Sequence, residues 1–354
     1  MATHDIIVIG ASAGGVEAIT SVIADLPRDL HASVFVVLHM SRGRSMLAEI
    51  LTRLGRLPAA QPADGESLQY GRVYVAMPDH HMVLEGGVVR MVHSAAENGV
   101  RPAVDPLFRS AARSYGPRVV GVILTGNLDD GTAGLAAIKS AGGVAIVQDP
   151  DEAFAPGMPR SAIAAVSVDH VLPLRDIPVM ITALTQEIAA PVHAHESSAH
   201  LQPMEPDLGQ MPLALEPKDR PGRVSVLTCP ECHGTLWEAD DESILRFRCR
   251  VGHVYSAESM LAAQTDEVDR ALWIALRTLE ERVALTSRLA DRARHREHHW
   301  VARAFDQRAR DAEVEASSVR QLLRVRHQSH LVPDGEGVQG PGGAINVPIA
   351  DRAD

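Results

Sequence analysis

The chain has 354 residues, of which 45% are hydrophobic and 3% aromatic, and its formal net charge is −11. This length allows two or three domains, and the hydrophobic content is enough for a core of aliphatic side chains. The acidic charge argues against nucleic acid as the main partner, because a phosphate-binding face needs an excess of basic residues. No apolar run approaches the ~20 residues that cross a bilayer, so we expect no membrane insertion. The N-terminus shows no secretory signal, and we expect a cytoplasmic protein.

The first 188 residues alternate between predicted strands and predicted helices. Short apolar runs predict buried strands at 5–9, 33–38, 72–76, 118–124, 143–148 and 168–172. Amphipathic spacing predicts helices at 15–26, 46–54, 105–115, 132–141, 158–166 and 174–188. This alternation is typical of a doubly wound, mostly parallel α/β sheet of the Rossmann-like class, which we assign to residues 1–188. Two apolar runs around Gly86 and Gly87, within residues 82–94, add a predicted β-hairpin.

The rest of the chain divides into four predicted segments. Residues 189–222 are a linker, and residues 223–256 hold every cysteine in a small ribbon-like module. Apolar residues at helical spacing predict a helical segment at 257–330, either a hairpin or a coiled-coil-like arm. The stretch HREHH at 295–299 is either the turn of that hairpin or part of one continuous helix. The Gly/Pro-rich residues 331–354 are predicted to be a disordered tail.

Three polar side chains follow predicted strands of the sheet. Ser12 lies in the glycine turn GASAGG at 10–15, His39 closes an apolar run, and Asp130 lies in the loop LTGNLDDG at 124–131. Because strand ends at one edge of a parallel sheet converge, these residues could act as nucleophile, base and orienting carboxylate. Each residue alone also has a structural interpretation, as a phosphate-binding turn, a core histidine or a helix cap.

The glycine turn departs from three well-known motifs. A dinucleotide-binding fingerprint needs glycine where Ser12 stands, and a P-loop needs a lysine that this turn lacks. The turn fits the bare G-x-S-x-G pattern of α/β-hydrolases, but the chain order Ser, His, Asp differs from that fold's Ser, Asp, His. A nucleotide-dependent oxidoreductase is an alternative that would require cofactor binding at this turn.

Five segments carry a resemblance to a known family: IGASAGG at 9–15, VVLHM at 36–40, MPDHHMVLEGG at 77–87, RPAVDPLFRSAA at 101–112 and LTGNLDDGTAG at 124–134. Together they resemble the catalytic domain of the chemotaxis protein-glutamate methylesterases, the CheB family. The resemblance implies hydrolysis of glutamate methyl esters on chemoreceptors, with deamidation of glutamine as a second activity. It begins at residue 4, so we expect a stand-alone form without the receiver domain of the best-known members.

The resemblance also implies a role for each site residue. Ser12 is the expected nucleophile, His39 the base and Asp130 the orienting carboxylate, since the family spacing selects Asp130 over the adjacent Asp129. Backbone N–H groups of Ala13 and Asn127 would stabilise the oxyanion. The family often has Met at the position of Asn127, but a main-chain donor does not depend on the side chain. This chemistry needs no cofactor.

The expected partners are the cytoplasmic helices of methylated chemoreceptors and, beyond these, other chemosensory proteins. A non-catalytic signalling adaptor that kept the esterase fold is the alternative function. His80 and His81 either line the site or end a turn. Arg101 and Arg109 either contact acidic receptor helices or are ordinary surface residues.

The cysteines form a metal-binding pattern. Cys229 and Cys232, followed by Cys249 and His253, give the spacing C-x2-C-x16-C-x3-H, which predicts a tetrahedral zinc site. Four protein ligands leave no position for water, so the metal would be structural. His233 could compete with His253, but it adjoins Cys232, which would strain the geometry. A set of buried thiols without metal is the alternative. One branch of the CheB family resembles this arrangement of an esterase domain beside such a module.

Overall fold

The computed structural model describes residues 3–40, 43–189, 222–241 and 244–329. The predicted tail lies outside these residues, as does the predicted linker except for its two end residues. The described chain forms two compact units, residues 1–264 and 265–354, which we describe separately. None of the helices in the described residues combines the length and the apolar character needed to cross a bilayer.

A seven-stranded sheet forms the centre of the first unit, in the order β10-β9-β8-β1-β2-β5-β3. Its strands are β1 (Ile6–Ala11), β2 (Ser33–Leu38), β3 (Ala59–Ala60), β5 (Arg72–Val75), β8 (Val119–Ile123), β9 (Val144–Gln148) and β10 (His170–Leu172). All six neighbouring pairs are parallel. The predicted parallel α/β fold is therefore confirmed.

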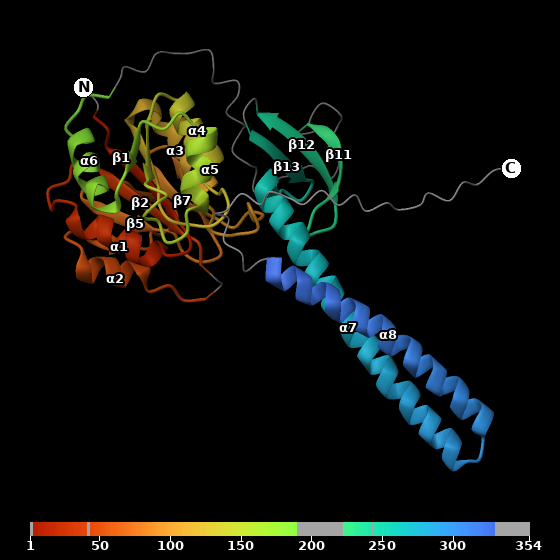
Figure 1. Cartoon of the computed structure of the whole chain (residues 1–354). Helices are drawn as coiled ribbons and strands as arrows, with labels where there is room; N and C mark the ends of the chain where they lie inside the picture. The colour runs from red at the N-terminus through yellow and green to blue at the C-terminus, as the bar shows by residue number, and fades with distance from the viewer. Residues whose placement is uncertain (1–2, 41–42, 190–221, 242–243, 330–354) are drawn as a thin grey trace. The chain divides into compact units, whose positions relative to one another are not determined.

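Helices cover both faces of this sheet (Figure 1). One face carries α1 (Gly15–Asp25), α2 (Leu47–Leu54) and α6 (Ile177–Leu184); the other carries α3 (Val104–Tyr115), α4 (Thr132–Ser140) and α5 (Gly157–Ala165). Ile7 and Ile9 of β1 enter the first core, and Ile6 and Val8 enter the second. Side chains alternate along a strand, so burial on both faces explains the uninterrupted apolar runs in the sequence.

Two smaller antiparallel sheets complete the first unit. The predicted hairpin is formed by β6 (His81–Glu85) and β7 (Val88–Val92), and β4 (Glu66–Ser67) pairs with β7. The cysteine-bearing module is a four-stranded sheet of β11 (Arg223–Thr228), β12 (Thr235–Asp241), β13 (Ile244–Cys249) and β14 (Val254–Ser256). We call residues 223–256 the Cys/His module. Two 3₁₀ turns, Gly116–Arg118 and Leu174–Asp176, lie between the larger elements.

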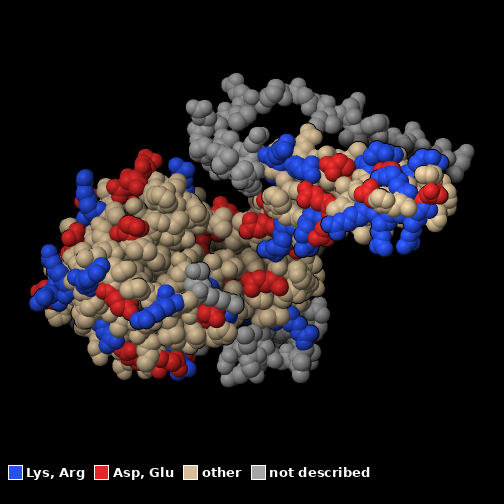
Figure 2. Space-filling view, turned by 90° about the horizontal axis from the view of Figure 1, so that it is seen from below, with Lys and Arg blue, Asp and Glu red and all other residues tan. Residues whose placement is uncertain are grey.

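The second unit is a helical hairpin. Its helices are α7 (Ala257–His295), which begins in the first unit, and α8 (His299–Ser329). Ion pairs join Arg326 to Asp269 at 2.5 Å and Arg320 to Glu280 at 3.0 Å, so the helices run antiparallel. The stretch at 295–299 thus contains the turn, at residues 296–298, and is not part of one continuous helix. Basic and acidic side chains are interspersed on the face of the molecule in Figure 2.

Candidate active site

Ser12 lies at the meeting point of three strand ends. It follows β1 directly, and its N–H donates to Thr125 O, just after β8, at 2.9 Å. Ala11 pairs with Leu38 of β2, and His39 N donates to Ala11 O at 3.1 Å. The backbone register therefore puts residues 12 and 39 side by side at the carboxyl edge of the sheet, where open α/β sheets bind ligands.

Glycines make room for this turn. Gly14, the residue directly before α1, has φ 74°, a left-handed conformation that glycine adopts without strain. A Cβ at Gly126 would overlap Met158 Sδ and would lie 2.9 Å from Ser12 Cβ. The segment after β8 can therefore pack against Ser12 only because residue 126 has no side chain.

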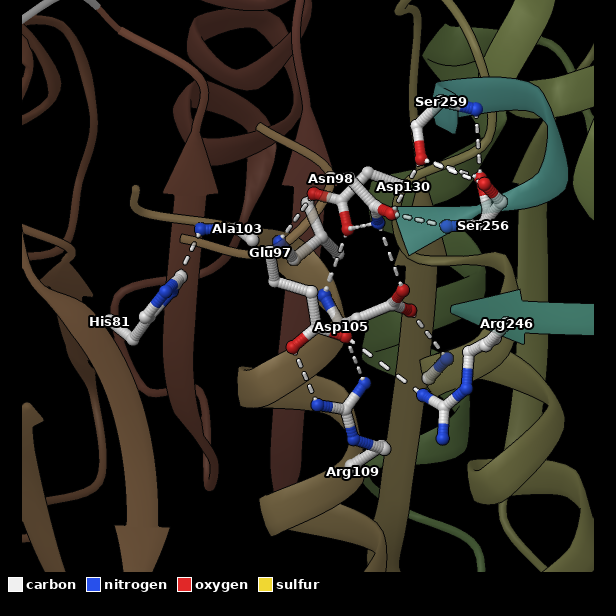
Figure 3. Close-up of polar contacts among 12 residues, drawn as sticks. His81, Glu97, Asn98, Ala103, Asp105, Arg109, Asp130, Arg246, Ser256 and Ser259 are labelled. Atoms are coloured by element: carbon white, nitrogen blue, oxygen red, sulfur yellow. Dashed lines mark hydrogen bonds and ion pairs between the residues drawn. The ribbon is translucent and has the colours of Figure 1, made fainter. Parts of the chain in front are cut away.

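His39 and Asp130 are in direct contact. His39 Nε2 lies 2.6 Å from Asp130 Oδ2, and the two side chains are 14% and 3% exposed. The carboxylate also accepts N–H groups from the first turn of α3, at 2.7 Å from Val104 N and 3.3 Å from Asp105 N. Asn98 Nδ2 is a fourth donor, at 3.1 Å. Figure 3 shows the environment of Asp130.

These donors keep Asp130 ionised. Burial would raise its pKa, but the hydrogen bond and charge of His39, with the N–H groups of Val104 and Asn98, outweigh burial and hold the pKa below its ordinary value. An ionised carboxylate only accepts hydrogen bonds, so His39 Nε2 must carry the proton. The other ring nitrogen, Nδ1, is then the one that can take a proton from Ser12.

The Ser12 hydroxyl has no hydrogen bond to His39 or to another group in the described residues. Catalytic serine–histidine contacts are often loose without substrate, so this geometry is compatible with a nucleophile. The structure thus brings His39 and Asp130 into contact and puts Ser12 beside His39 through the backbone.

Asp129, the neighbour of Asp130, faces a different partner. Its Oδ1 accepts a hydrogen bond from Ser256 Oγ at 2.7 Å. Burial, opposed by that hydrogen bond and assisted by the nearby charges of Glu258 and Asp130, raises the pKa of Asp129 to about 6. Asp129 therefore lies outside the contact with His39.

Two loops frame the space beside Ser12 where an oxyanion would form. Thr125 Oγ1 donates to Ala13 O at 2.9 Å and accepts from Ala155 N at 2.8 Å, which ties the loops together. The backbone N–H groups of Ala13 and Asn127 have no acceptor among the described residues. Free N–H groups on adjacent loops are the arrangement that an oxyanion hole requires.

The remaining polar residues named from the sequence have structural partners. His81 is 2% exposed; its Nδ1 accepts from Ala103 N and its Nε2 contacts Ala95 O, both at 3.1 Å. Burial, only partly offset by the Glu97 charge, lowers the pKa of His81, so this ring is a neutral part of the core. Arg109 forms two hydrogen bonds with Glu97, at 2.6 and 2.7 Å, and therefore does not act as an ordinary surface arginine.

A cavity of about 630 Å³ opens at His39. Met40, Asp79 and Arg101 of the α/β domain line it, together with Glu231 and His253 of the Cys/His module. Arg101 is paired with Asp79 through Nε at 3.0 Å and Nη2 at 2.7 Å. His80 is half-buried, with Nδ1 3.2 Å from Pro78 O. The module therefore contributes to the wall of the space that adjoins the candidate catalytic histidine.

Four side chains of the module could hold a metal ion: Cys229, Cys232, Cys249 and His253, whose ligand atoms all lie within 4.8 Å of one another. Cys249 Sγ lies 3.6 Å from Cys232 Sγ and 3.4 Å from His253 Nδ1. Metal–sulfur bonds of ~2.3 Å in a tetrahedron imply ligand separations of ~3.8 Å, so the cluster fits zinc with a small adjustment. His253 Nε2 contacts Glu231 Oε2 at 3.1 Å, the outer partner typical of a metal-bound imidazole. His233 is not part of the cluster.

Comparisons with known proteins identify the first half of the chain. The family model described as CheB methylesterase matches residues 7–181, which contain Ser12, His39 and Asp130. A protein-glutamate methylesterase/protein-glutamine glutaminase 2 of Anaeromyxobacter dehalogenans is 42% identical over 183 residues, 51% of this chain and 54% of that protein. A protein of Leptospira interrogans whose name gives the same two activities is 39% identical over 186 residues, 52% of this chain and 96% of that protein.

A solved structure is similar over the same part. The CheB methylesterase catalytic domain of Thermotoga maritima is 36% identical, with a TM-score of 0.50, and the match covers 52% of this chain and 99% of that domain. A relative in Moorella thermoacetica, 43% identical, is matched over 44% of its length. The chain thus spans about half the length of several curated relatives that it matches.

Proposed function

The chain belongs to the CheB methylesterase family, and on this premise we propose that it is a protein-glutamate methylesterase. It acts as a serine hydrolase on glutamate methyl esters of chemoreceptors. The observation that supports this most directly is the 2.6 Å contact between His39 and Asp130, beside Ser12 at the carboxyl edge of the sheet. A base held by a buried carboxylate next to a serine is the constellation that activates a hydroxyl for acyl transfer.

The proposed reaction has two steps. Ser12 Oγ attacks the ester carbonyl while His39 Nδ1 accepts the hydroxyl proton, and Asp130 stabilises the imidazolium that forms. The N–H groups of Ala13 and Asn127 donate to the oxyanion, each contributing ~3 kcal/mol. Methanol leaves with the proton from His39. Water then attacks the acyl-enzyme, with His39 again as base, and releases the glutamate side chain and the free serine.

The same site accounts for a second activity. A glutamine amide has the same carbonyl geometry as the ester, and ammonia replaces methanol as the leaving group, as the names of the relatives indicate for those proteins. An amine leaving group requires firmer protonation by His39 than methanol does, so we propose that the ester is hydrolysed faster. The proposed substrates are cytoplasmic helices of methylated chemoreceptors, which implies a cytoplasmic location.

We also propose that the Cys/His module binds one structural zinc ion through Cys229, Cys232, Cys249 and His253. When bound, the metal would tie the β11–β12 turn to the end of β13, and it would take no part in ester hydrolysis because all four positions are protein ligands. Metal analysis of freshly purified protein tests this. About one equivalent of zinc, reduced severalfold by Cys232→Ser, is expected; less than about half an equivalent would contradict the four-ligand site.

Methanol release from methylated receptor fragments tests the esterase. We expect release by the wild-type protein, and losses of more than about a thousandfold for Ser12→Ala and His39→Ala. Fluorophosphonate labelling should stop in Ser12→Ala, and His81→Gln, which changes a core histidine, should keep labelling as the matched control. A wild-type protein that binds receptor fragments, but neither releases methanol nor labels at Ser12, would be the non-catalytic adaptor.

A further inference from the structure

Asn98 connects the candidate catalytic carboxylate to the start of α7. Its amide nitrogen donates to Asp130 Oδ1 at 3.1 Å and to Asp105 Oδ2 at 3.4 Å. Its amide oxygen accepts from Ser256 N at 3.0 Å and from Ser259 Oγ at 2.9 Å. Figure 3 shows Asn98 among these partners. The four contacts use both donors and both acceptor positions of the amide.

The chemistry of these partners permits one orientation of the amide. If the group were flipped, its oxygen would face two carboxyl groups, and its NH₂ would face the N–H of Ser256. The ionised Asp130 accepts only, and the backbone N–H of Ser256 donates only. The contact with the N–H of Ser256 therefore fixes the direction in which Asn98 donates to Asp130, and the hydroxyl of Ser259 adds a second contact to the amide oxygen.

The same segment also holds the backbone of Asn98. This residue has φ 54°, a left-handed conformation that asparagine tolerates. Its N–H donates to Val254 O at 2.7 Å, and Val254 N donates to Ala96 O at 3.3 Å. Glu97 forms a parallel bridge with Val254. The first residue of β14 thus pairs with residues 96–98, so the backbone of Asn98 depends on the same segment as its amide.

Buried ionisable groups surround Asn98 and raise the cost of a misplaced amide. Burial, together with the negative charges of Asp130 and Glu97, raises the pKa of Asp105 well above its ordinary value. Glu97 is 3% exposed, and besides its pairing with Arg109 it lies 3.9 Å from Arg246 of β13. The Cys/His module therefore also contributes a positive charge to this acidic cluster.

We propose that Asn98 is a positioning residue for the Ser12–His39–Asp130 triad, and that the β14–α7 junction, residues 254–259, fixes its geometry. The proposal rests on the proposed function, since Asp130 supports catalysis only in an esterase. Asn98 is not among the residues that line the cavity at His39, so it acts through Asp130 and not on the substrate. Residues more than 120 positions after Asp130 in the chain thereby influence the reaction rate.

Three variants test the proposal. Asn98→Gly removes the amide and still tolerates positive φ, so it separates the side-chain contacts from backbone strain. Ser259→Ala removes one donor to Asn98, and the double variant completes a cycle. Ser161→Ala is the matched control, because Ser161 Oγ donates to Glu258 at 3.2 Å in the same first turn of α7 without touching Asn98. Each protein is assayed for kcat and KM of methanol release, and for the downfield N–H proton resonance of His39, identified by its loss in Asp130→Asn.

We expect Asn98→Gly to lower kcat by at least about tenfold, the rate equivalent of one charge-assisted hydrogen bond, with KM changed less than about twofold. Ser259→Ala should lower kcat by about threefold in the wild-type background and have no further effect in Asn98→Gly. Both variants should move or broaden the His39 resonance. Ser161→Ala should leave kcat and the resonance unchanged.

Equal effects of Ser259→Ala in both backgrounds would refute the proposal, because the contact would then support only the fold. An unchanged His39 resonance in Asn98→Gly, or a higher kcat in Ser259→Ala, would also refute it. If Asn98→Gly does not fold, the kcat and resonance of Ser259→Ala decide. If the wild-type protein releases no methanol, the proposed function fails, while the resonances of the same variants still test the positioning of Asp130.

Discussion

Replacement of Asp130 by asparagine separates a catalytic carboxylate from a structural one. The two oxygens of Asp130 face only N–H donors: His39 and Val104 at Oδ2, and Asn98 and Asp105 at Oδ1. The NH₂ group of an asparagine would meet two of these donors in either orientation. The simplest relief is for His39 to change tautomer, so that Nε2 accepts and Nδ1 carries the proton.

The size of the effect follows from that tautomer. With a proton on Nδ1, His39 cannot take the proton of Ser12, and the hydroxyl stays a weak nucleophile. Loss of the correct tautomer in a serine–histidine–aspartate triad lowers kcat by about 10⁴-fold, equivalent to about 5.5 kcal/mol. We expect a loss of this order for Asp130→Asn, with KM nearly unchanged because the carboxylate is buried away from the substrate.

The assay is methanol release from methylated receptor fragments, with Asp129→Asn as the matched control. Asp129 contacts Ser256 and not His39, so its amide should retain at least about a third of the wild-type kcat. If Asp130→Asn kept more than a tenth of the wild-type kcat while Asp129→Asn released no methanol, our assignment of the orienting carboxylate would be wrong. Correct folding of both variants is checked by circular dichroism.

Three further predictions concern stability. Folding raises the pKa of Asp129 to about 6, so ionisation of this carboxyl opposes folding. The stability that the protonated carboxyl confers at low pH is therefore lost as the pH rises from about 4 to 6. The free energy of unfolding of Asp129→Asn, measured in urea, should accordingly rise by up to about 2 kcal/mol relative to that of the wild type between pH 4.5 and pH 7.5. Gly126→Ala should cost about 1–3 kcal/mol and most of the methanol release, because its Cβ overlaps Met158 Sδ. Arg109→Met should cost about 3–5 kcal/mol in thermal unfolding, because Glu97 stays buried without its two-bond partner.

Each of these has a contrary outcome. A pH-independent difference between Asp129→Asn and wild type would mean that the carboxyl ionises without cost in the folded protein. Wild-type activity in Gly126→Ala would show that the loop after β8 can move away from the serine. A stable Arg109→Met protein would mean that Glu97 is protonated or reaches water, and Arg109→Lys serves as the comparison that keeps the charge but loses the paired geometry.

Local patterns in the sequence predict most of the strands and helices of the fold. The predicted strand at 33–38 matches β2 residue for residue, and that at 118–124 exceeds β8 by one residue at each end, because strands buried on both faces appear as short apolar runs. The two-residue strands Ala59–Ala60 and Glu66–Ser67 were not predicted, since two residues have no period. The helix predicted at 174–188 begins as a 3₁₀ turn and ends at Leu184.

Part of the site could be predicted from the sequence, but the contacts that support Asp130 could not. Strand ends and the family motif together lead to Ser12, His39 and Asp130. Asn98 gives only the turn signal of an Asn-Gly pair, and nothing local indicates that its amide lies between Asp130 and Ser259. That contact depends on how the Cys/His module packs against the α/β domain, which is a long-range property. The same holds in part for Glu97, which pairs with Arg109 twelve positions further along the chain but also lies near Arg246 of the distant strand β13.

The order of the large sheet has a consequence for evolution within this architecture. Ser12, His39 and Asp130 follow the three middle strands β1, β2 and β8, and two more strands lie on either side of these three. The edge strands are β10 and β3. If an edge strand frays or lengthens, at least one intact row of backbone hydrogen bonds still lies between it and the three middle strands. Changes at the borders of such a sheet can therefore be accommodated without displacing the side chains at its midline.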